Sequence, residues 1–282
     1  MTLSDCLERL SDLPDLDRRI ILKEVCSLSD TDLIIHKDRE ISLSECETIF
    51  SCADKRREGT PLAYILGHWG FRYNTFLTPE GVLVPRPDTE VLVESVLKCI
   101  FSKDRITILD MCAGTGCIGI STALELAEKY NNLSIELHLS DLSSVAFDTF
   151  SKNAESLIHS SKIKVFTHKG NLFEPFEKTE IKFDLILTNP PYIPSSVIPT
   201  LGKAVLSEPL LALDGGESGL EFIEREIREM IPFLKEDGTV FMEIGYDQGQ
   251  GVSSLFRTAG FTNTQVIRDY GNNDRVVKAS FK

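Results

Sequence analysis

Positive charge is scarce in this sequence, which has 30 Lys and Arg residues against 43 Asp and Glu residues and a net charge of −13. Tight binding to bare nucleic acid depends on basic side chains that neutralise phosphates. We therefore expect no stable binding to DNA or RNA. A basic protein surface is the better match for so acidic a chain.

Long hydrophobic runs are also missing, since no stretch approaches the roughly 20 apolar residues of a membrane-spanning helix. Residues 1–5 hold no basic region ahead of an apolar one, so we expect no secretory signal. The seven cysteines form no Cys-x-x-Cys pair and fall mostly in apolar helical patterns, which is typical of buried free thiols. Cys112 and Cys117 have no histidine cluster beside them, so no metal site is expected. These features predict a protein of the reducing cytoplasm without membrane association.

The first part of the chain is predicted to be helical. Apolar residues recur at helical spacing through residues 1–70, and Ser42 followed by Glu45 predicts a capping box. Residues 71–84 mix aromatic and β-branched side chains with turn residues, a pattern typical of a β-hairpin. We predict a helical substrate-recognition domain at 1–70, a hairpin linker at 71–84 and an α/β domain at 85–282.

Strands and helices alternate in the third segment. We predict strands at residues 107–109, 135–139, 164–167, 239–244, 264–268 and 276–281, with a further strand that ends at Asn189. Helices are expected near residues 91–100, 117–129, 144–157, 220–234 and 250–259. Such alternation predicts a mostly parallel, doubly wound sheet. The connection at 269–274 is too short for a helix, so the last two strands should be antiparallel.

A glycine-bearing turn follows the first of these strands and predicts a cofactor loop. Glycine between a first strand and its helix lets a ligand approach the backbone closely. Asp141 follows the second strand, about 25 positions after the loop, and can accept hydrogen bonds from ribose hydroxyls. The alternative is that Asp141 caps the following helix. The candidate loop residues are Asp110, Cys112, Ala113, Gly114, Thr115 and Gly116.

The apolar strand that begins near Phe183 stops at two consecutive prolines, at the sheet edge where open α/β folds bind ligands. The Asn189 side-chain oxygen and the Pro190 carbonyl can accept both N–H bonds of an amide or amine and keep its lone pair turned toward an electrophile. Tyr192 can stack on a planar group. A plain strand-ending turn is the alternative. We predict these catalytic residues: Asn189, Pro190, Pro191 and Tyr192.

This corner distinguishes between two kinds of cofactor. Hydride transfer from a dinucleotide has no use for a site that grips an amide, whereas methyl transfer from a sulfonium to a weak nitrogen nucleophile does. The sequence therefore predicts S-adenosyl-L-methionine as the cofactor, with Asn189 touching it as well as the acceptor. The sequence has neither a nucleophile-elbow serine motif nor a P-loop lysine that would indicate another chemistry.

The chain resembles the HemK-type release factor glutamine methyltransferases over nearly all of its length. The tetrapeptide of residues 189–192, called the clamp below, is shared with amino-methylating DNA and RNA enzymes. The other motifs are more specific to the family. They are residues 59–67, the entrance motif at 83–90, the pairs 208–209, 212–213, 215–216 and 219–220, and the tail motif at 268–271.

The resemblance implies a Rossmann-like class I methyltransferase fold with a seven-stranded sheet, and transfer of a methyl group to the glutamine amide in the Gly-Gly-Gln loop of class I peptide release factors. It implies that the helical domain and the hairpin hold the factor, and we expect a cytoplasmic monomer. By position, Asp141 holds the ribose of the cofactor and Asn171 or Leu172 lies beside the adenine. Asn189 and Pro190 bind the glutamine amide, and Tyr192 forms a wall of the pocket.

Two positions depart from the family pattern. The family has glycine where this chain has Cys112, which is unstrained at negative φ and strained at positive φ. Many relatives have tryptophan at the position of Leu172. Three other functions stay open: methylation of a ribosomal-protein glutamine, amino methylation of a nucleic acid base, and a binding protein that has kept the fold without activity.

Overall fold

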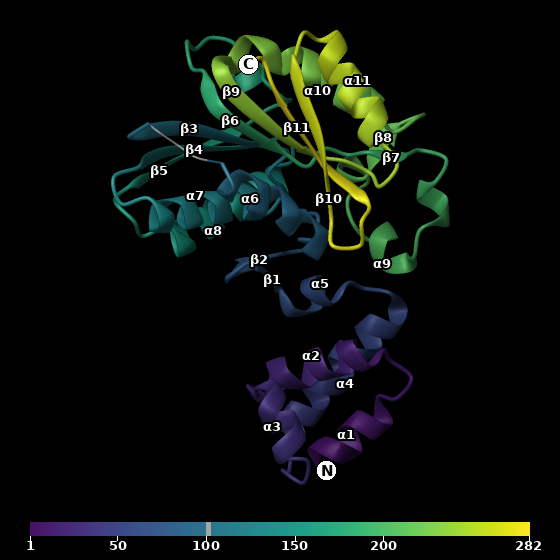
Figure 1. Cartoon of the computed structure of the whole chain (residues 1–282). Coiled ribbons are helices and arrows are strands. Elements are labelled where there is room, and N and C mark those ends of the chain that lie inside the picture. Colours follow the sequence, from purple (N-terminus) through teal and green to yellow (C-terminus); the bar gives the residue numbers. More distant parts are fainter. Residues whose placement is uncertain (100–102) are drawn as a thin grey trace. The chain divides into compact units, whose positions relative to one another are not determined.

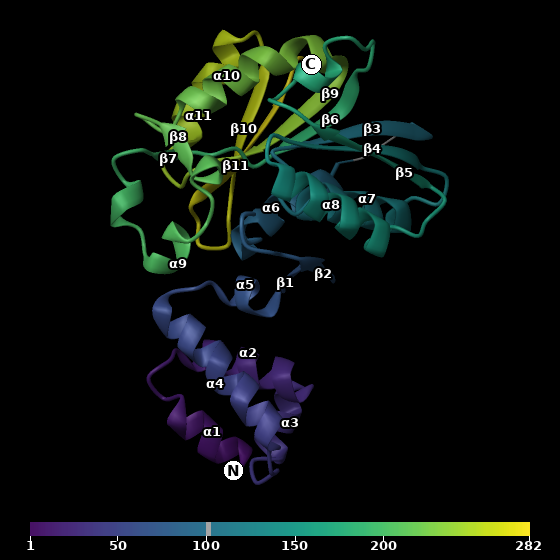
Figure 2. The same cartoon turned by 180° about the vertical axis from the view of Figure 1, so that it is seen from behind.

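The computed structural model describes residues 1–99 and 103–282, and the chain forms two compact units (Figures 1 and 2). The first comprises Met1–Gly67 together with Gly202–Ser207. The second comprises His68–Leu201 together with Glu208–Lys282. No helix in these described ranges is long and apolar enough to cross a membrane.

The first unit is helical, and α1, α3 and α4 start at side-chain caps. Reciprocal capping boxes begin three of them, and the one predicted at Ser42 and Glu45 is confirmed. Arg56 of α4 donates from Nε to Asp17 of α2 at 2.6 Å, which ties two helices together. The helices are α1 (Leu3–Arg9), α2 (Asp15–Cys26), α3 (Asp30–Ile35), α4 (Leu43–Glu58), α5 (Leu62–Leu66) and α9 (Lys203–Leu206).

The second unit begins with an antiparallel hairpin, β1 (His68–Phe71) and β2 (Asn74–Leu77). The rest of the predicted linker, residues 78–84, is irregular backbone that buries Val82 and Val84. Arg72 turns the hairpin with a φ of 53°.

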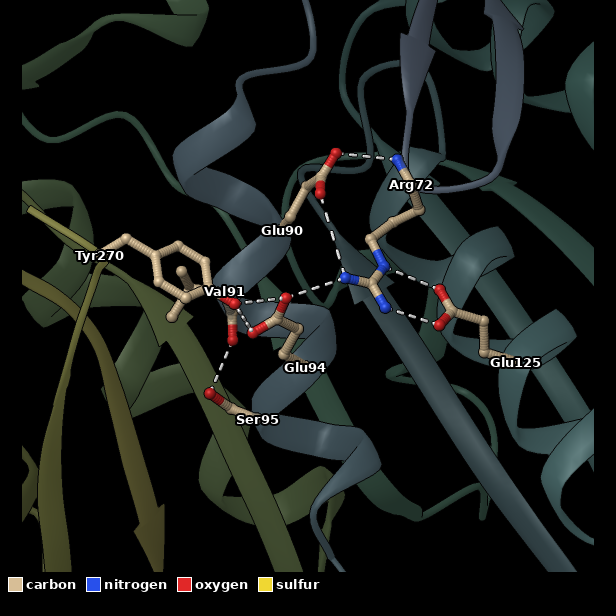
Figure 3. A network of polar contacts seen from close by, with 7 residues as sticks. All are labelled: Arg72, Glu90, Val91, Glu94, Ser95, Glu125 and Tyr270. Carbon is tan, nitrogen blue, oxygen red and sulfur yellow. Dashed lines mark hydrogen bonds and ion pairs between the residues drawn. The ribbon is translucent and has the colours of Figure 1, made fainter.

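The Arg72 side chain anchors the hairpin to the helices below it (Figure 3). Its guanidinium donates to Glu125 of α7 (Cys117–Lys129) at 2.9 and 2.7 Å and to Glu94 of α6 (Glu90–Leu97) at 3.1 Å. Its backbone N–H donates to Glu90 at 2.9 Å. The Tyr270 hydroxyl reaches the same Glu94 carboxylate at 2.8 Å, so the tail motif meets this network as well. The hairpin is therefore fixed by the carboxylates of two helices, α6 and α7.

A seven-stranded sheet forms the centre of the second unit, with the order β10-β11-β9-β6-β3-β4-β5. The strands from β9 to β5 are parallel, and β11 runs antiparallel to both β9 and β10. The mostly parallel sheet and its antiparallel last pair are confirmed. The strands are β3 (Arg105–Met111), β4 (Ser134–Asp141), β5 (Ile163–Lys169), β6 (Phe183–Thr188), β9 (Leu234–Glu243), β10 (Asn263–Arg268) and β11 (Asp274–Ser280).

The strand order reverses between β3 and β6. From β3 the chain moves outward through β4 and β5, and it then returns to place β6 on the other side of β3. The carboxyl ends of β3 and β6 therefore flank a topological switch point, where open α/β sheets bind ligands. This is the position of both predicted motifs, the glycine loop after β3 and the clamp after β6.

Helices cover both faces of the sheet (Figures 1 and 2). One apolar cluster joins the sheet to α6, α7 and α8 (Ser144–Leu157), and another joins it to α10 (Glu221–Met230) and α11 (Gly249–Thr258). Two short strands follow the clamp, β7 (Ile193–Pro194) and β8 (Asp214–Gly216), and they pair in parallel.

The predicted helices at 117–129 and 144–157 have the bounds of α7 and α8. The helix predicted at 220–234 was too long, because α10 ends at Met230 and a 3₁₀ turn follows over Ile231–Phe233. Pro232 in that turn has no N–H for another helical hydrogen bond. The helix predicted at 91–100 is α6, Glu90–Leu97, and Ile100 lies outside the described residues.

Candidate functional site

The loop after β3 turns sharply into α7. Cys112, Gly114 and Gly116 have φ values of 55°, 56° and 76°, so the chain adopts the left-handed region at three of five positions. A Cβ at Gly116 would lie 2.9 Å from the Cβ of Phe150, whereas one at Gly114 would meet no atom within 4 Å. The loop therefore packs against the protein interior at Gly116, and it has free space next to it at Gly114. The positive φ of Cys112 makes this position strained for a cysteine.

Asp110 supports the loop from within. It is fully buried, and its Oδ2 accepts a hydrogen bond from the N–H of Gly119 at 2.8 Å. Burial raises the pKa of this carboxyl well above its ordinary value. Asp110 does not line the cavity described below, so the structure places it beneath the loop.

Asp141, at the end of β4, closes the other side of the loop. Its Oδ2 accepts the N–H of Gly114 at 2.9 Å, and its Oδ1 accepts the N–H of Ser143 at 2.9 Å. Ser143 is the N-cap of α8 and accepts from Ala146, so the alternative role of Asp141 as the helix cap is wrong. A carboxylate offers about four lone pairs, which leaves room for further donors. Burial raises the pKa of Asp141, against the hydrogen bonds from Ser143 and Gly114.

A cavity lies between the glycine loop, the start of α8 and the clamp. Asn171 and Leu172 both line it, and Leu172 has a φ of 48°. Apolar side chains dominate its wall, with Asp141 as a charged group among them. Its lining also includes residues 81–83, Met111, Cys112, Gly114, Leu142, Ser143, Ala146, Gly170, Asn189, Pro191, Pro209, Leu211, Ala212 and Phe222.

A smaller second cavity adjoins the first. Leu83, Cys112, Gly114 and Asn189 line both. The second is bounded further by residues 84–86 of the entrance motif and by Thr89, Ala113, Thr115, Cys117 and Ile118. Gly116 lines neither cavity among those described. In the entrance motif, Arg86 forms an ion pair with the buried Glu208, which also accepts the N–H of Val84 at 3.0 Å.

Asn189 stands where the two cavities meet. It directly follows β6 and is half-buried. Among the described residues, no hydrogen-bond partner is found for its side-chain amide, although that side chain lines both cavities. Asn189 thus presents a free donor and acceptor to any ligand in this space.

The backbone that follows Asn189 is held firmly. Pro190 and Pro191 are buried, and Pro191 lines the first cavity. Gln248 donates from Nε2 to the Tyr192 carbonyl at 2.9 Å. A Cβ on Gly215 would lie 2.8 Å from the Cα of Tyr192, so the glycine turn packs directly on the clamp. These contacts hold the Tyr192 end of the clamp backbone in place.

The Tyr192 side chain contacts a buried acid next to the site. Tyr192 is not one of the residues that line either of the two cavities. Its hydroxyl instead donates to Oε1 of Glu243 at 3.3 Å, and its ring packs against the buried cluster below α10 and α11. Burial, and then the Glu243 charge, raise the pKa of its hydroxyl. Of the four clamp residues, Asn189 and Pro191 line these cavities, whereas Pro190 and Tyr192 line neither of the two.

Sequence reasoning missed two buried acids beside this site. Glu243 ends β9, and burial raises its pKa to about 7. Glu226 lies on α10 close to Thr188 and Cys112, and burial raises its pKa to about 8. Glu243 had a signal, because it follows the apolar residues 240–242 just as Asn189 follows its strand. Glu226 also had one, because it shares the buried side of α10 with Ile223 and Ile227.

The chain is similar to known proteins over nearly all of its length. Family models described as "PrmC N-terminal domain" and "Methyltransferase small domain" match residues 2–67 and 86–217. The release factor glutamine methyltransferase of Clostridium botulinum is 37% identical, over 94% of this chain and 91% of that protein. The protein of that name from Agrobacterium fabrum is 36% identical, over 94% and 89%.

A solved structure supports the fold. The hMettl16 catalytic domain in complex with the MAT2A 3′UTR hairpin 1 superposes with a TM-score of 0.56 at 15% identity, over 94% of this chain and 91% of that one. At this identity the likeness concerns the fold alone.

Proposed function

The chain belongs to the release factor glutamine methyltransferase family, and from this premise we propose that it methylates the glutamine amide in the Gly-Gly-Gln loop of class I release factors. S-adenosyl-L-methionine is the methyl donor. The observation that carries the proposal is the Asn189 carboxamide, which has no partner among the described residues and lines two adjoining cavities.

The first cavity fits the cofactor. The space above Gly114 is open, as a ligand close to the backbone requires. Asp141 keeps lone pairs for the two ribose hydroxyls after accepting two backbone N–H groups. Met111, Leu172 and Phe222 offer apolar surface to a planar base. When bound, the cofactor would supply a methyl group activated by the sulfonium, so the chain itself needs no strong general base.

The clamp orients the acceptor. An amide nitrogen is a weak nucleophile because its lone pair is delocalised into the carbonyl. The side-chain oxygen of Asn189 and the carbonyl of Pro190 accept hydrogen bonds from its two N–H groups. These bonds turn the nitrogen lone pair toward the methyl group of the donor. Because the clamp backbone is fixed by Gln248 and Gly215, this orientation is set before the substrate binds, and positioning supplies most of the rate.

The helical unit is proposed to recognise the release factor. Residues 2–67 match the PrmC N-terminal domain, and this unit carries no part of the two cavities. We expect the protein to work as a cytoplasmic monomer, which gel filtration with light scattering would test. Its acidic charge favours a partner with a basic surface.

One labelling experiment tests the proposed function. The protein is incubated with methyl-labelled S-adenosyl-L-methionine and, in parallel, with a class I release factor, ribosomes and DNA. Label is expected in the release factor, and it should be lost when the glutamine of the Gly-Gly-Gln loop is replaced by alanine. Label confined to a ribosomal protein or to DNA would instead support one of the two alternative substrates.

A further inference from the structure

Glu243 is a buried acid at the edge of the site that the methyl-transfer scheme leaves without a role. It is 1% exposed and ends β9, next to the strand that leads into the clamp. Its Oε1 accepts the Tyr192 hydroxyl at 3.3 Å, and its Oε2 is buried without a hydrogen-bond partner among the described residues. Burying a carboxyl that is only partly paired is unfavourable, because the hydrogen bonds that it loses to water are not replaced.

The groups around Glu243 come from four other segments. Arg275 of β11 is near enough to favour the carboxylate, and Asp88 of the entrance motif disfavours it. Thr89 lies beside it, with a hydroxyl that completes no hydrogen bond. Cys117 at the start of α7 also experiences the Glu243 charge.

Arg275 links the surrounding segments to each other. Its Nη2 lies 3.0 Å from Asp269 in the tail motif and 3.4 Å from Asp88 in the entrance motif. Its backbone carbonyl accepts the N–H of Ile244, the residue after Glu243, at 2.9 Å. Entrance motif, tail motif and clamp therefore meet around one buried carboxyl.

We propose that Glu243 is a positioning residue: its carboxyl group accepts the Tyr192 hydroxyl, holds that side chain and thereby keeps the clamp in register with the entrance motif. The inference rests on the proposed function, since it assigns a role within that reaction. Glu243 touches neither cavity, so it acts through Tyr192 and does not contact the reacting atoms.

The ionisation of Glu243 makes this role dependent on pH. Burial raises its pKa to about 7, against the opposing effects of Thr89, Arg275 and Tyr192. A hydrogen bond to a carboxylate is roughly twice as strong as one to a neutral acid. Tyr192 is therefore held more firmly once Glu243 ionises, and turnover should rise with pH through about 7.

The test is a double-mutant cycle of Glu243→Gln and Tyr192→Phe in the full chain, with kcat and KM for release factor measured from about pH 6 to pH 9. We expect Glu243→Gln to lower kcat about tenfold near pH 9 and to leave the KM for cofactor within about twofold. The dependence of kcat on pH should become flatter in this variant. Tyr192→Phe should flatten it too, and the double variant should be no slower than Glu243→Gln. Asp184→Asn is the matched control, because Asp184 is a buried, bonded acid at the opposite edge of the sheet; its profile should match the wild type.

A wild-type profile in Glu243→Gln, or additive losses in the double variant, would overturn the inference. If Glu243→Gln does not fold, Tyr192→Phe still decides, since loss of the hydroxyl must flatten the profile. The same double-mutant cycle can be measured in free energies of unfolding, which requires no substrate. In that measurement, the coupling energy between Glu243 and Tyr192 should grow with pH. If that coupling appears while the wild type labels no release factor, the proposed function fails and the contact stands.

Discussion

Buried acids are paired differently at the amino ends and at the carboxyl ends of the parallel strands, which are called the amino edge and the carboxyl edge below. At the amino edge, Asp184 accepts from Lys103 at 2.6 Å, from Lys235 at 2.7 Å and from the N–H of Thr107 at 2.8 Å. At the carboxyl edge, buried oxygens of Asp110, Glu226 and Glu243 complete no hydrogen bond among the described residues. The first edge is built for stability, and the second keeps polar groups available at a cost in stability.

The contrast predicts opposite responses to pH. Burial alone would raise the pKa of Asp184, but hydrogen bonds from Lys103, Lys235 and Thr107 outweigh it and lower that pKa below 3.8. The stability from Asp184 is therefore present above pH 3.8 and is lost as the pH falls further. Glu226 and Glu243 have raised pKa values, so their contributions are greatest below their ordinary value of 4.5 and are lost as the pH rises through 7 to 8.

The largest effect is expected at the carboxyl edge, on activity. Asn189→Ala removes the side-chain oxygen that orients the acceptor, so kcat should fall by about a thousandfold, or roughly 4 kcal/mol. Cofactor affinity, measured by calorimetry, should stay within about tenfold because Asp141 and the loop are intact. Turnover within tenfold of wild type would mean that the corner at residues 189–190 is only a strand-ending turn.

The amino edge should show the reverse, a loss of stability without a loss of chemistry. Asp184→Ala leaves two lysines and a buried backbone N–H without their partner, and we expect a loss of roughly 3 to 4 kcal/mol in the free energy of unfolding. Urea denaturation measures it, and kcat per folded molecule should equal the wild type. A matching fall in kcat would show that the two edges are not independent.

Features with a local signal in the sequence were predicted, and a contact between distant residues was not. Helices 117–129 and 144–157 were predicted to the residue, because their apolar faces and flanking loops are local signals. The cavity residues Asn171, Leu172 and Asn189 follow strand ends, where position along the chain implies position at the sheet edge. The hydrogen bond from Tyr192 to Glu243 was not predicted, because the two residues lie 51 positions apart. No local pattern reports such a tertiary contact.

The burial of Glu226 gives the next prediction. Burial raises the pKa of Glu226 to about 8 in the folded chain. Because of this one group, the free energy of unfolding should fall by about 3 kcal/mol between pH 5 and pH 8. Glu226→Gln has no proton to lose, so its stability should be flatter over that range. Glu226→Leu should be more stable than the wild type at pH 8, because it removes an unpaired buried acid. Parallel curves for wild type and Glu226→Gln would contradict the raised pKa.

Cofactor affinity should depend on Asp141 by a smaller amount. Asp141→Ala removes the proposed acceptor for the ribose hydroxyls and should weaken binding by about ten- to a hundredfold, roughly 1.4 to 3 kcal/mol. Ser42→Ala is the control, since it removes the cap of α4 at a residue that lines neither cavity, and it should lower stability with affinity retained. Unchanged affinity in Asp141→Ala would leave Asp141 with the single task of holding the loop.

The smallest effect concerns the strained loop and compares alanine with glycine. In a helix alanine is the more stable of the two, by about 1 kcal/mol, and Cys52 in the middle of α4 should follow that order. At Cys112 the φ of 55° is unfavourable for any residue with a side chain. The free energy of unfolding of Cys112→Gly, measured by urea denaturation, should therefore exceed that of Cys112→Ala by about 1 kcal/mol. Because both substitutions remove the thiol, their difference isolates the backbone. The usual order at Cys112 would show that this turn carries no strain, and the carboxyl edge would then owe its lower stability to buried polar groups alone.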